Sequence, residues 1–194
     1  LVKTGGGTLD LTNTANSYDV GTNIDANGNK TAVIGNTVIN GGVLAVTKDD
    51  QLGTKAQGVG TALATSDQYK WKLGNVQIDG GTLQTNSGID TKRYLVIGDA
   101  GATLDVDGAA NTTTLSGLVE GTGTLVKEGD GTLKINFNAA NYQGKTVGSD
   151  GSVTLSSTYT SNKIAGLSVN SGVLEIDNAV KDLGGVVPVN LAGG

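Results

Sequence analysis

The chain contains no cysteine, no histidine and no methionine, and it has one proline in 194 residues. Without cysteine there is no disulfide framework, so hydrogen bonds and aliphatic packing must hold the fold together. Without histidine or cysteine the chain has no Ser-His-Asp triad, no Cys-His pair and no zinc site built on these ligands. These absences exclude several large classes of enzyme before any motif is considered.

Large rings, basic patches and long apolar runs are also scarce. The aromatic residues are Trp71, Phe137 and five tyrosines, and the formal net charge is −5 without a basic cluster. This charge argues against nucleic acid as a partner. No stretch reaches the roughly 18 consecutive apolar residues of a membrane helix, so we expect no membrane insertion by this segment. Because Leu1 begins inside a repeat unit, we interpret the chain as a piece of a longer protein.

Glycine, in contrast, accounts for 32 residues, and many of them open a repeated phrase. The phrase is a glycine, a small residue, a leucine or valine, a variable residue and then usually an aliphatic residue. Since strand side chains alternate between two faces, each copy predicts a strand with one dry and one solvated face. The copies begin at Gly7, Gly42, Gly81, Ala102, Gly123, Gly131, Gly151 and Gly172. The predicted dry-face residues include Leu9, Leu11, Leu104, Val106, Leu133, Ile135, Val153, Leu155, Leu174 and Ile176.

The copies recur at nearly constant intervals. The steps from Gly81 to Ala102 and from Ala102 to Gly123 are each 21 residues, and those from Gly131 to Gly151 and to Gly172 are 20 and 21. This period is too long for a hairpin, and it lacks the helical segment of a leucine-rich repeat. It suits one coil that buries its aliphatic residues against the next coil, about 4.8 Å away. We therefore predict an all-β fold, a right-handed parallel β-helix with coils of about 21 residues.

Two intervals are longer and predict loop insertions near residues 13–30 and 48–72, within a single β-helix spanning residues 1–194. Residues 48–72 include Tyr69 and Trp71, the one aromatic cluster on a predicted loop. These rings either pack the loop onto the coil or contact a ligand, and both interpretations remain open. Tyr69 and Trp71 are therefore the candidate binding residues.

Two groups of charged residues contain acids that could carry chemistry. Residues 105–108 begin like a calcium loop but lack a third acid and the closing glutamate, so a solvated turn and no metal site are predicted. Asp49, Asp50 and Arg93 invite comparison with the sites of polysaccharide-active β-helix enzymes. Adjacent side chains diverge in direction, so here too a solvated turn is the favoured interpretation. The sequence predicts no catalytic residue and no cofactor.

Several segments carry a family resemblance. Residues 1–12 and 125–135 resemble the opening of the autotransporter-associated β-strand repeat, and residues 50–53, 91–94 and 141–146 resemble its later segments. The likeness covers most of the chain and keeps the family's order. It implies a pertactin-like passenger domain of a Gram-negative autotransporter, exported by type V secretion and displayed at the cell surface.

The resemblance, the regular coil and the excluded catalytic sets together predict a non-catalytic stalk or adhesin segment. Its expected partners are a host cell surface, the extracellular matrix or another copy of itself, with recognition on the insertions. The alternative hypothesis is a fragment of a polysaccharide-active β-helix enzyme that uses Asp49 and Asp50.

Overall fold

The computed structural model describes residues 1–16, 20–24, 30–34, 37–53, 76–93, 95–117, 119–136, 145–147, 153–155, 166–176 and 189–192. In these residues the regular structure is β-strand, apart from one short 3-10 helix, η1 (Asp49–Leu52). No helix in this part of the chain is long and apolar enough to cross a membrane.

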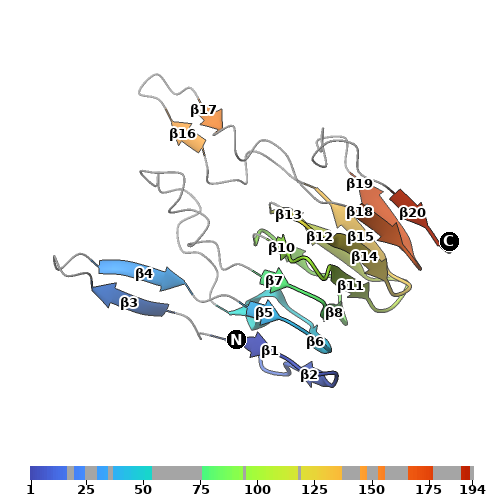
Figure 1. Ribbon diagram of the computed structural model, residues 1–194, viewed down its shortest axis with the longest axis horizontal. Helices are drawn as coiled ribbons and strands as arrows, with labels where there is room; N and C mark the ends of the chain where they lie inside the picture. The colour runs from blue at the N-terminus through green and yellow to red at the C-terminus, as the bar shows by residue number, and fades with distance from the viewer. Residues whose placement is uncertain are drawn as a thin grey trace.

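Three parallel sheets run along the length of the molecule (Figure 1). The first sheet contains β1 (Val2–Lys3), β5 (Thr37–Ile39), β7 (Val76–Ile78), β10 (Leu95–Ile97) and β13 (Val119–Gly121). The second contains β2 (Thr8–Asp10), β6 (Val43–Val46), β8 (Thr82–Thr85), β11 (Ala102–Val106), β14 (Thr124–Glu128), β18 (Gly166–Val169) and β20 (Val189–Leu191). The third contains β9 (Asp90–Thr91), β12 (Thr112–Leu115), β15 (Thr132–Ile135) and β19 (Val173–Ile176).

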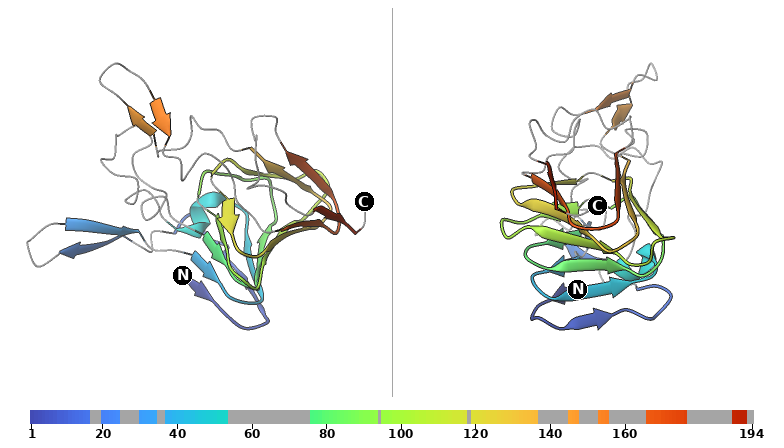
Figure 2. Two further views of the ribbon diagram at one scale, coloured as in Figure 1. Left: turned by 45° about the horizontal axis from the view of Figure 1, so that its top comes forward. Right: turned by 90° about the vertical axis from the view of Figure 1, so that its right-hand side faces the viewer.

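From β7 to β15 the chain visits the three sheets in turn and then returns to the first. One circuit, such as β10, β11 and β12, forms a coil, and each strand pairs in parallel with its counterpart in the next coil. The coils stack from the N-terminal end to the C-terminal end (Figure 2, right). The molecule is therefore a parallel β-helix, as the glycine phrase predicts.

The core is a dry stack of aliphatic side chains from all three sheets. Leu104, Val106, Leu133 and Ile135 are at most 1% exposed, which confirms the predicted inward face. Leu9, Leu11 and Leu174 are only partly buried against this core. Ile176 is 41% exposed because β19 is the last strand of its sheet in the described part of the chain.

The predicted steps from Gly131 to Gly151 and to Gly172 are wrong. β17 (Val153–Leu155) pairs antiparallel with β16 (Lys145–Val147) in a separate hairpin, and β15 pairs directly with β19. Residues 132–135 and 173–176 are thus neighbouring strands of the third sheet, and the hairpin lies between them in sequence. The glycine phrase cannot distinguish these pairings, because side chains alternate with a period of two in parallel and antiparallel strands alike.

The predicted stacking of Ala102 on Gly123 is also shifted. In the structure Ala102 lies opposite Leu125, and Leu104 lies opposite Lys127. A shift of two residues leaves the inward and outward faces unchanged. Lys127 shares the inward face with Leu125, and the shift places it beside Leu104.

Three long connections, here called excursions, interrupt the stack: residues 17–36, 54–75 and 137–165. The first contains the antiparallel hairpin β3 (Val20–Ile24) and β4 (Lys30–Ile34), and the third contains β16 and β17. Both hairpins project from the coil stack (Figures 1 and 2). By comparison, only residues 92–94 separate β9 from β10, and only residues 116–118 separate β12 from β13.

Candidate functional site

The candidate binding residues Tyr69 and Trp71 lie outside the described residues. Their role in recognition remains a prediction. At the start of the predicted insertion that contains them, residues 48–53 are described, and they belong to the body of the coil. Leu52 is 1% exposed and packs in the core, and Gln51 is equally buried.

Asp49 and Arg93 form a buried ion pair, so the predicted solvated turn is wrong for Asp49. Arg93 Nε donates to Asp49 Oδ1 at 2.8 Å, and the two side chains are 4% and 8% exposed. The guanidinium also donates to the backbone carbonyls of Asp49, Leu52 and Gly53, at 3.0, 3.3 and 2.6 Å. The partners are 44 residues apart in sequence, and no local pattern indicates that they meet.

This geometry removes the paired-carboxylate interpretation of Asp49 and Asp50. Asp49 is buried against a guanidinium, whereas Asp50 is exposed. A carboxylate pair that acts on a glycosidic bond must flank the bond within one accessible cleft. Two neighbouring acids, one inside and one outside the coil, do not meet that requirement.

Lys3 and Lys127 are buried as well, and sequence reasoning missed both. Lys3 Nζ donates to the carbonyls of Thr4, Gly5 and Gly41, at 2.9, 2.8 and 3.0 Å. Lys127 repeats the arrangement with the carbonyls of Glu128, Gly129 and Ser171, at 2.5, 2.7 and 3.3 Å. In each set two carbonyls belong to the lysine's own turn and one to the next coil. Each ammonium therefore has three backbone acceptors, which match its three donors.

The two lysine sites share their backbone pattern. The amide of Asn40 donates to the Lys3 carbonyl and that of Val43 to Gly7, while Asn170 and Val173 donate to Lys127 and Gly131. Two sequence motifs specify this arrangement, and each occurs twice. The motif that contains the lysine is Leu-Val-Lys-x-Gly-x-Gly-Thr-Leu, at residues 1–9 and 125–133. The motif of the next coil is Asn-Gly/Ser-Gly-Val-Leu, at residues 40–44 and 170–174. The first copy turns from the first sheet to the second and the other from the second to the third, so the phrase specifies a corner.

Gly42 and Gly172 give the lysines their space. Both have positive φ, +64° and +69°, where a side chain is strained. A Cβ atom at Gly172 would lie 2.3 Å from the Gly129 carbonyl oxygen and 2.8 Å from Lys127 Nζ. At Gly42 it would lie 2.3 Å from the Gly5 oxygen and 2.6 Å from Lys3 Nζ. The corner accepts only glycine at these two positions.

Burial lowers the pKa of Lys127 from its ordinary value of 10.5, because the charged form is desolvated. The carboxylates of Asp105, Asp130 and Glu128 act in the opposite direction and favour the ammonium. Desolvation is the larger effect. The three backbone carbonyls therefore bind the Lys127 ammonium in a site where burial disfavours the charged form.

Asp105 belongs to β11 and not to the predicted turn, which begins only after Val106. Asp105 Oδ2 accepts a hydrogen bond from Gln84 Nε2 at 2.8 Å, and Asp107 is exposed. In the described ranges no three acidic side chains converge in a way that could hold a metal ion.

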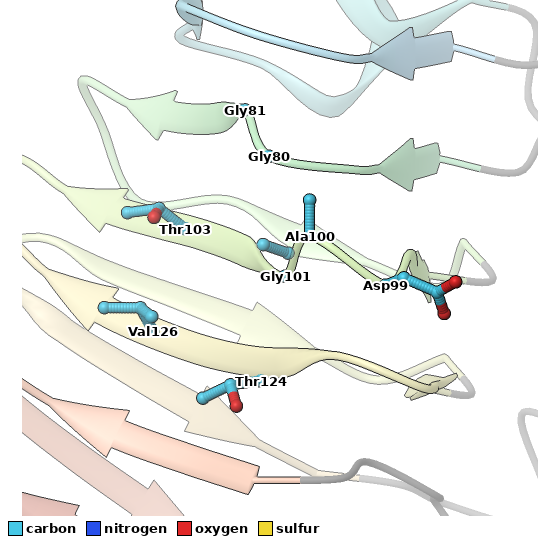
Figure 3. A pocket seen from close by; sticks show the side chains of 9 residues that line it. Gly80, Gly81, Asp99, Ala100, Gly101, Thr103, Thr124 and Val126 are labelled. Carbon is cyan, nitrogen blue, oxygen red and sulfur yellow. The ribbon is translucent and has the colours of Figure 1, made fainter.

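A shallow hollow of about 210 Å³ lies over the corner between the first and second sheets (Figure 3). Its lining combines glycine, small and β-branched residues with one carboxylate: Gly80, Gly81, Asp99, Ala100, Gly101, Ala102, Thr103, Thr124 and Val126. Asp99 accepts a hydrogen bond from the Thr122 hydroxyl. The one carboxylate of the lining is therefore already hydrogen-bonded within the protein.

Comparison with known proteins finds a relative that matches most of this chain. The chain is 35% identical over 189 residues to a protein named Adhesin BmaC autotransporter, from Brucella suis biovar 1 (strain 1330). The match covers 91% of this chain and 4% of the relative's length. No family model and no solved structure matches the chain. The chain is thus similar to a short stretch of an autotransporter adhesin.

Proposed function

We propose that this chain is a non-catalytic β-helical segment of a Gram-negative autotransporter passenger, displayed at the cell surface and used in adhesion. The observation that carries the proposal is the 35% identity to a protein named as an autotransporter adhesin, over 91% of the chain. The described residues support it, because the coil body holds aliphatic side chains and internally bonded cations rather than a catalytic set.

In this proposal the coil stack is a scaffold and the excursions are the recognition elements. The stack is held by parallel backbone pairing from β2 through β20 in the second sheet, and it presents a mostly polar outer surface. Insertions on a solenoid commonly carry binding residues. Tyr69 and Trp71 in residues 54–75 are the proposed contacts, since aromatic side chains supply large contact areas at low entropic cost. The proposed partners are a host cell surface or the extracellular matrix.

The proposal is tested with beads that carry the 194-residue chain. Three variants are compared with the parent: Tyr69→Ser with Trp71→Ser, a chain with residues 54–72 replaced by a short glycine-serine turn, and Lys134→Ser as a control on the outer face of the coil. Binding to host cells and to matrix-coated surfaces is measured, and bead–bead aggregation reports self-association. Melting curves show whether each variant remains folded.

We expect the parent and Lys134→Ser to bind equally and the two loop variants to lose binding while keeping the parent's melting transition. Aggregation of beads without binding to cells or matrix would replace the host partner with a second copy of the chain. Absence of both activities in the folded parent would reject an adhesive role for this segment. Turnover of a glycan by the parent, lost in a folded Asp50→Asn variant, would favour the enzymatic alternative.

A further inference from the structure

Three cationic side chains are buried in the described part of the chain, and each joins two neighbouring coils: Lys3, Arg93 and Lys127. Three excursions interrupt the stack, at residues 17–36, 54–75 and 137–165. Each buried cation bridges a different one of these interruptions.

The two lysines bridge the first and the third excursion in the same way. Lys3 lies in the coil before residues 17–36, and its ammonium bonds Gly41 in the coil that follows them, 38 residues along the chain. Lys127 lies in the coil before residues 137–165 and bonds Ser171, 44 residues along the chain. In both cases the acceptor lies at a corner of the coil that follows the excursion.

Arg93 bridges the second excursion from the other direction. It follows β9, in the coil after residues 54–75, and its guanidinium reaches back to η1 in the coil before them. Its acceptors include the Asp49 carboxylate and the carbonyls of residues 49, 52 and 53, which lie directly before the excursion.

The uninterrupted junctions are built differently. Residues 76–136, described except for residues 94 and 118, stack three coils through short connections. Apart from Arg93 and Lys127, the lysines and arginines in this range are Lys92, which is exposed, and Lys134, on the outer face. The side-chain contacts across these junctions include the buried hydroxyl pair Thr85–Thr113 at 2.6 Å and the outer Gln84–Asp105 bond at 2.8 Å.

Loop closure gives this correspondence a physical reason. Each doubling of the length of a flexible connection lowers the probability of closing it about threefold. Docking a coil after a long excursion therefore costs more conformational entropy than docking it after a short connection. We propose that Lys3, Arg93 and Lys127 are clamps that fasten the returning coil to the preceding one, so that the stack keeps its register across each excursion.

The test uses the 194-residue chain and two backgrounds. In the second background, residues 136–165 are replaced by a copy of residues 116–123, which carry β13 and connect the third sheet to the second in a regular coil. Lys127→Met is made in both backgrounds, because methionine keeps an apolar stem and removes the ammonium. Thr113→Val is the matched control, because it removes a buried polar group at an uninterrupted junction.

Hydrogen exchange of backbone amides is measured for residues 166–176, which include Asn170 and Val173, and for residues 102–115 as a reference. We expect Lys127→Met to speed exchange in 166–176 about tenfold or more in the parent background and to leave 102–115 unchanged. In the shortened background the same substitution should change exchange less than about threefold. Thr113→Val should have the same effect in both backgrounds.

An equal effect of Lys127→Met in the two backgrounds, no effect in either, or an effect spread over residues 102–115 would overturn the proposal. If Lys127→Met unfolds the parent but not the shortened chain, the clamp is supported directly. If it unfolds both, the lysine is needed regardless of the excursion and the proposal fails. A shortened chain that does not fold also overturns it, because residues 136–165 would then be part of the coil rather than an interruption.

Discussion

Lys127 of β14 lies opposite Leu104 of β11, and both side chains are buried in the same inward column of the second sheet. The aliphatic stem of the lysine continues the apolar column, while its ammonium leaves the core at the corner and meets three carbonyls. A charged residue thus takes a core position without leaving an unpaired donor. The five predictions that follow test the core, the corners and the clamps separately.

The core should not tolerate a charge at Leu104. Leu104→Asp places a carboxylate in a site that is 1% exposed and has no partner for it. We expect a loss of at least about 3 kcal/mol in the free energy of unfolding, measured by urea denaturation. Lys134→Ser, which removes an exposed ion pair with Glu175, should change the same quantity by about 0.5 kcal/mol or less. Equal midpoints for the two variants would show that Leu104 does not face the core.

Gly172→Ala should destabilise the corner around Lys127. Its φ of +69° strains any side chain, and the new methyl group would meet the Gly129 oxygen and Lys127 Nζ. We expect a loss of at least about 2 kcal/mol. Gly6→Ala is the control, because no atom lies within 4 Å of its Cβ position. If both variants melt with the parent, the corner is looser than the structure shows.

Stability should depend on Lys127 in the alkaline range. Because burial lowers its pKa below 10.5, the unfolded chain binds more protons than the folded chain between the folded and unfolded pKa values. The free energy of unfolding must therefore rise with pH in that interval. Urea denaturation of the parent and Lys127→Met should give a difference that shifts in favour of the parent as the pH approaches 10.5. A difference that shifts against the parent would mean that Asp105, Asp130, Glu128 and the carbonyls outweigh desolvation.

The Arg93–Asp49 pair should show strong coupling. Arg93→Met removes the guanidinium from the buried Asp49 carboxylate, and removal of one partner of such a pair typically costs about 3–5 kcal/mol. Asp49→Asn made in the Arg93→Met background should recover part of this loss, because the buried negative charge is gone. A double-mutant cycle on unfolding free energies measures the coupling, and additive losses would show that the two side chains act independently.

The boundary of the second excursion should matter more than its length. Replacing residues 54–72 with a short turn leaves η1 and the acceptors of Arg93 in place, so the melting temperature should stay within a few degrees of the parent. Replacing residues 48–72 removes Leu52 and the acceptors on residues 49, 52 and 53 that bind Arg93. This second variant should lose its cooperative melting transition. Similar melting of the two would contradict the structural role of residues 48–53.

Much of the body could be predicted from local pattern. The alternation in residues 102–106 and 132–135 placed Leu104, Val106, Leu133 and Ile135 inside, because a period of two holds for any strand. The same argument failed at residues 153–155, where the strand pairs antiparallel in a hairpin. Alternation describes one strand and carries no information about which strand lies beside it.

The burial of the three cations could not be predicted from the sequence, for a related reason. Lys3 and Lys127 occur in two copies of one phrase, and their acceptors in two copies of another, but the phrases meet only after an excursion has been crossed. Arg93 and Asp49 have no repeated context at all. They pair because η1 lies beside the end of β9 in the following coil.

By itself, the sequence determined the class of fold, the inward residues of the regular strands and the absence of histidine- and cysteine-based chemistry, since all of these depend on residue type and short spacing. The tertiary structure decided which copy of the phrase stacks on which, where Ala102 meets Leu125, and which cations are buried. Those outcomes are set by contacts between residues 23 to 44 positions apart, whose energies depend on how the whole coil closes.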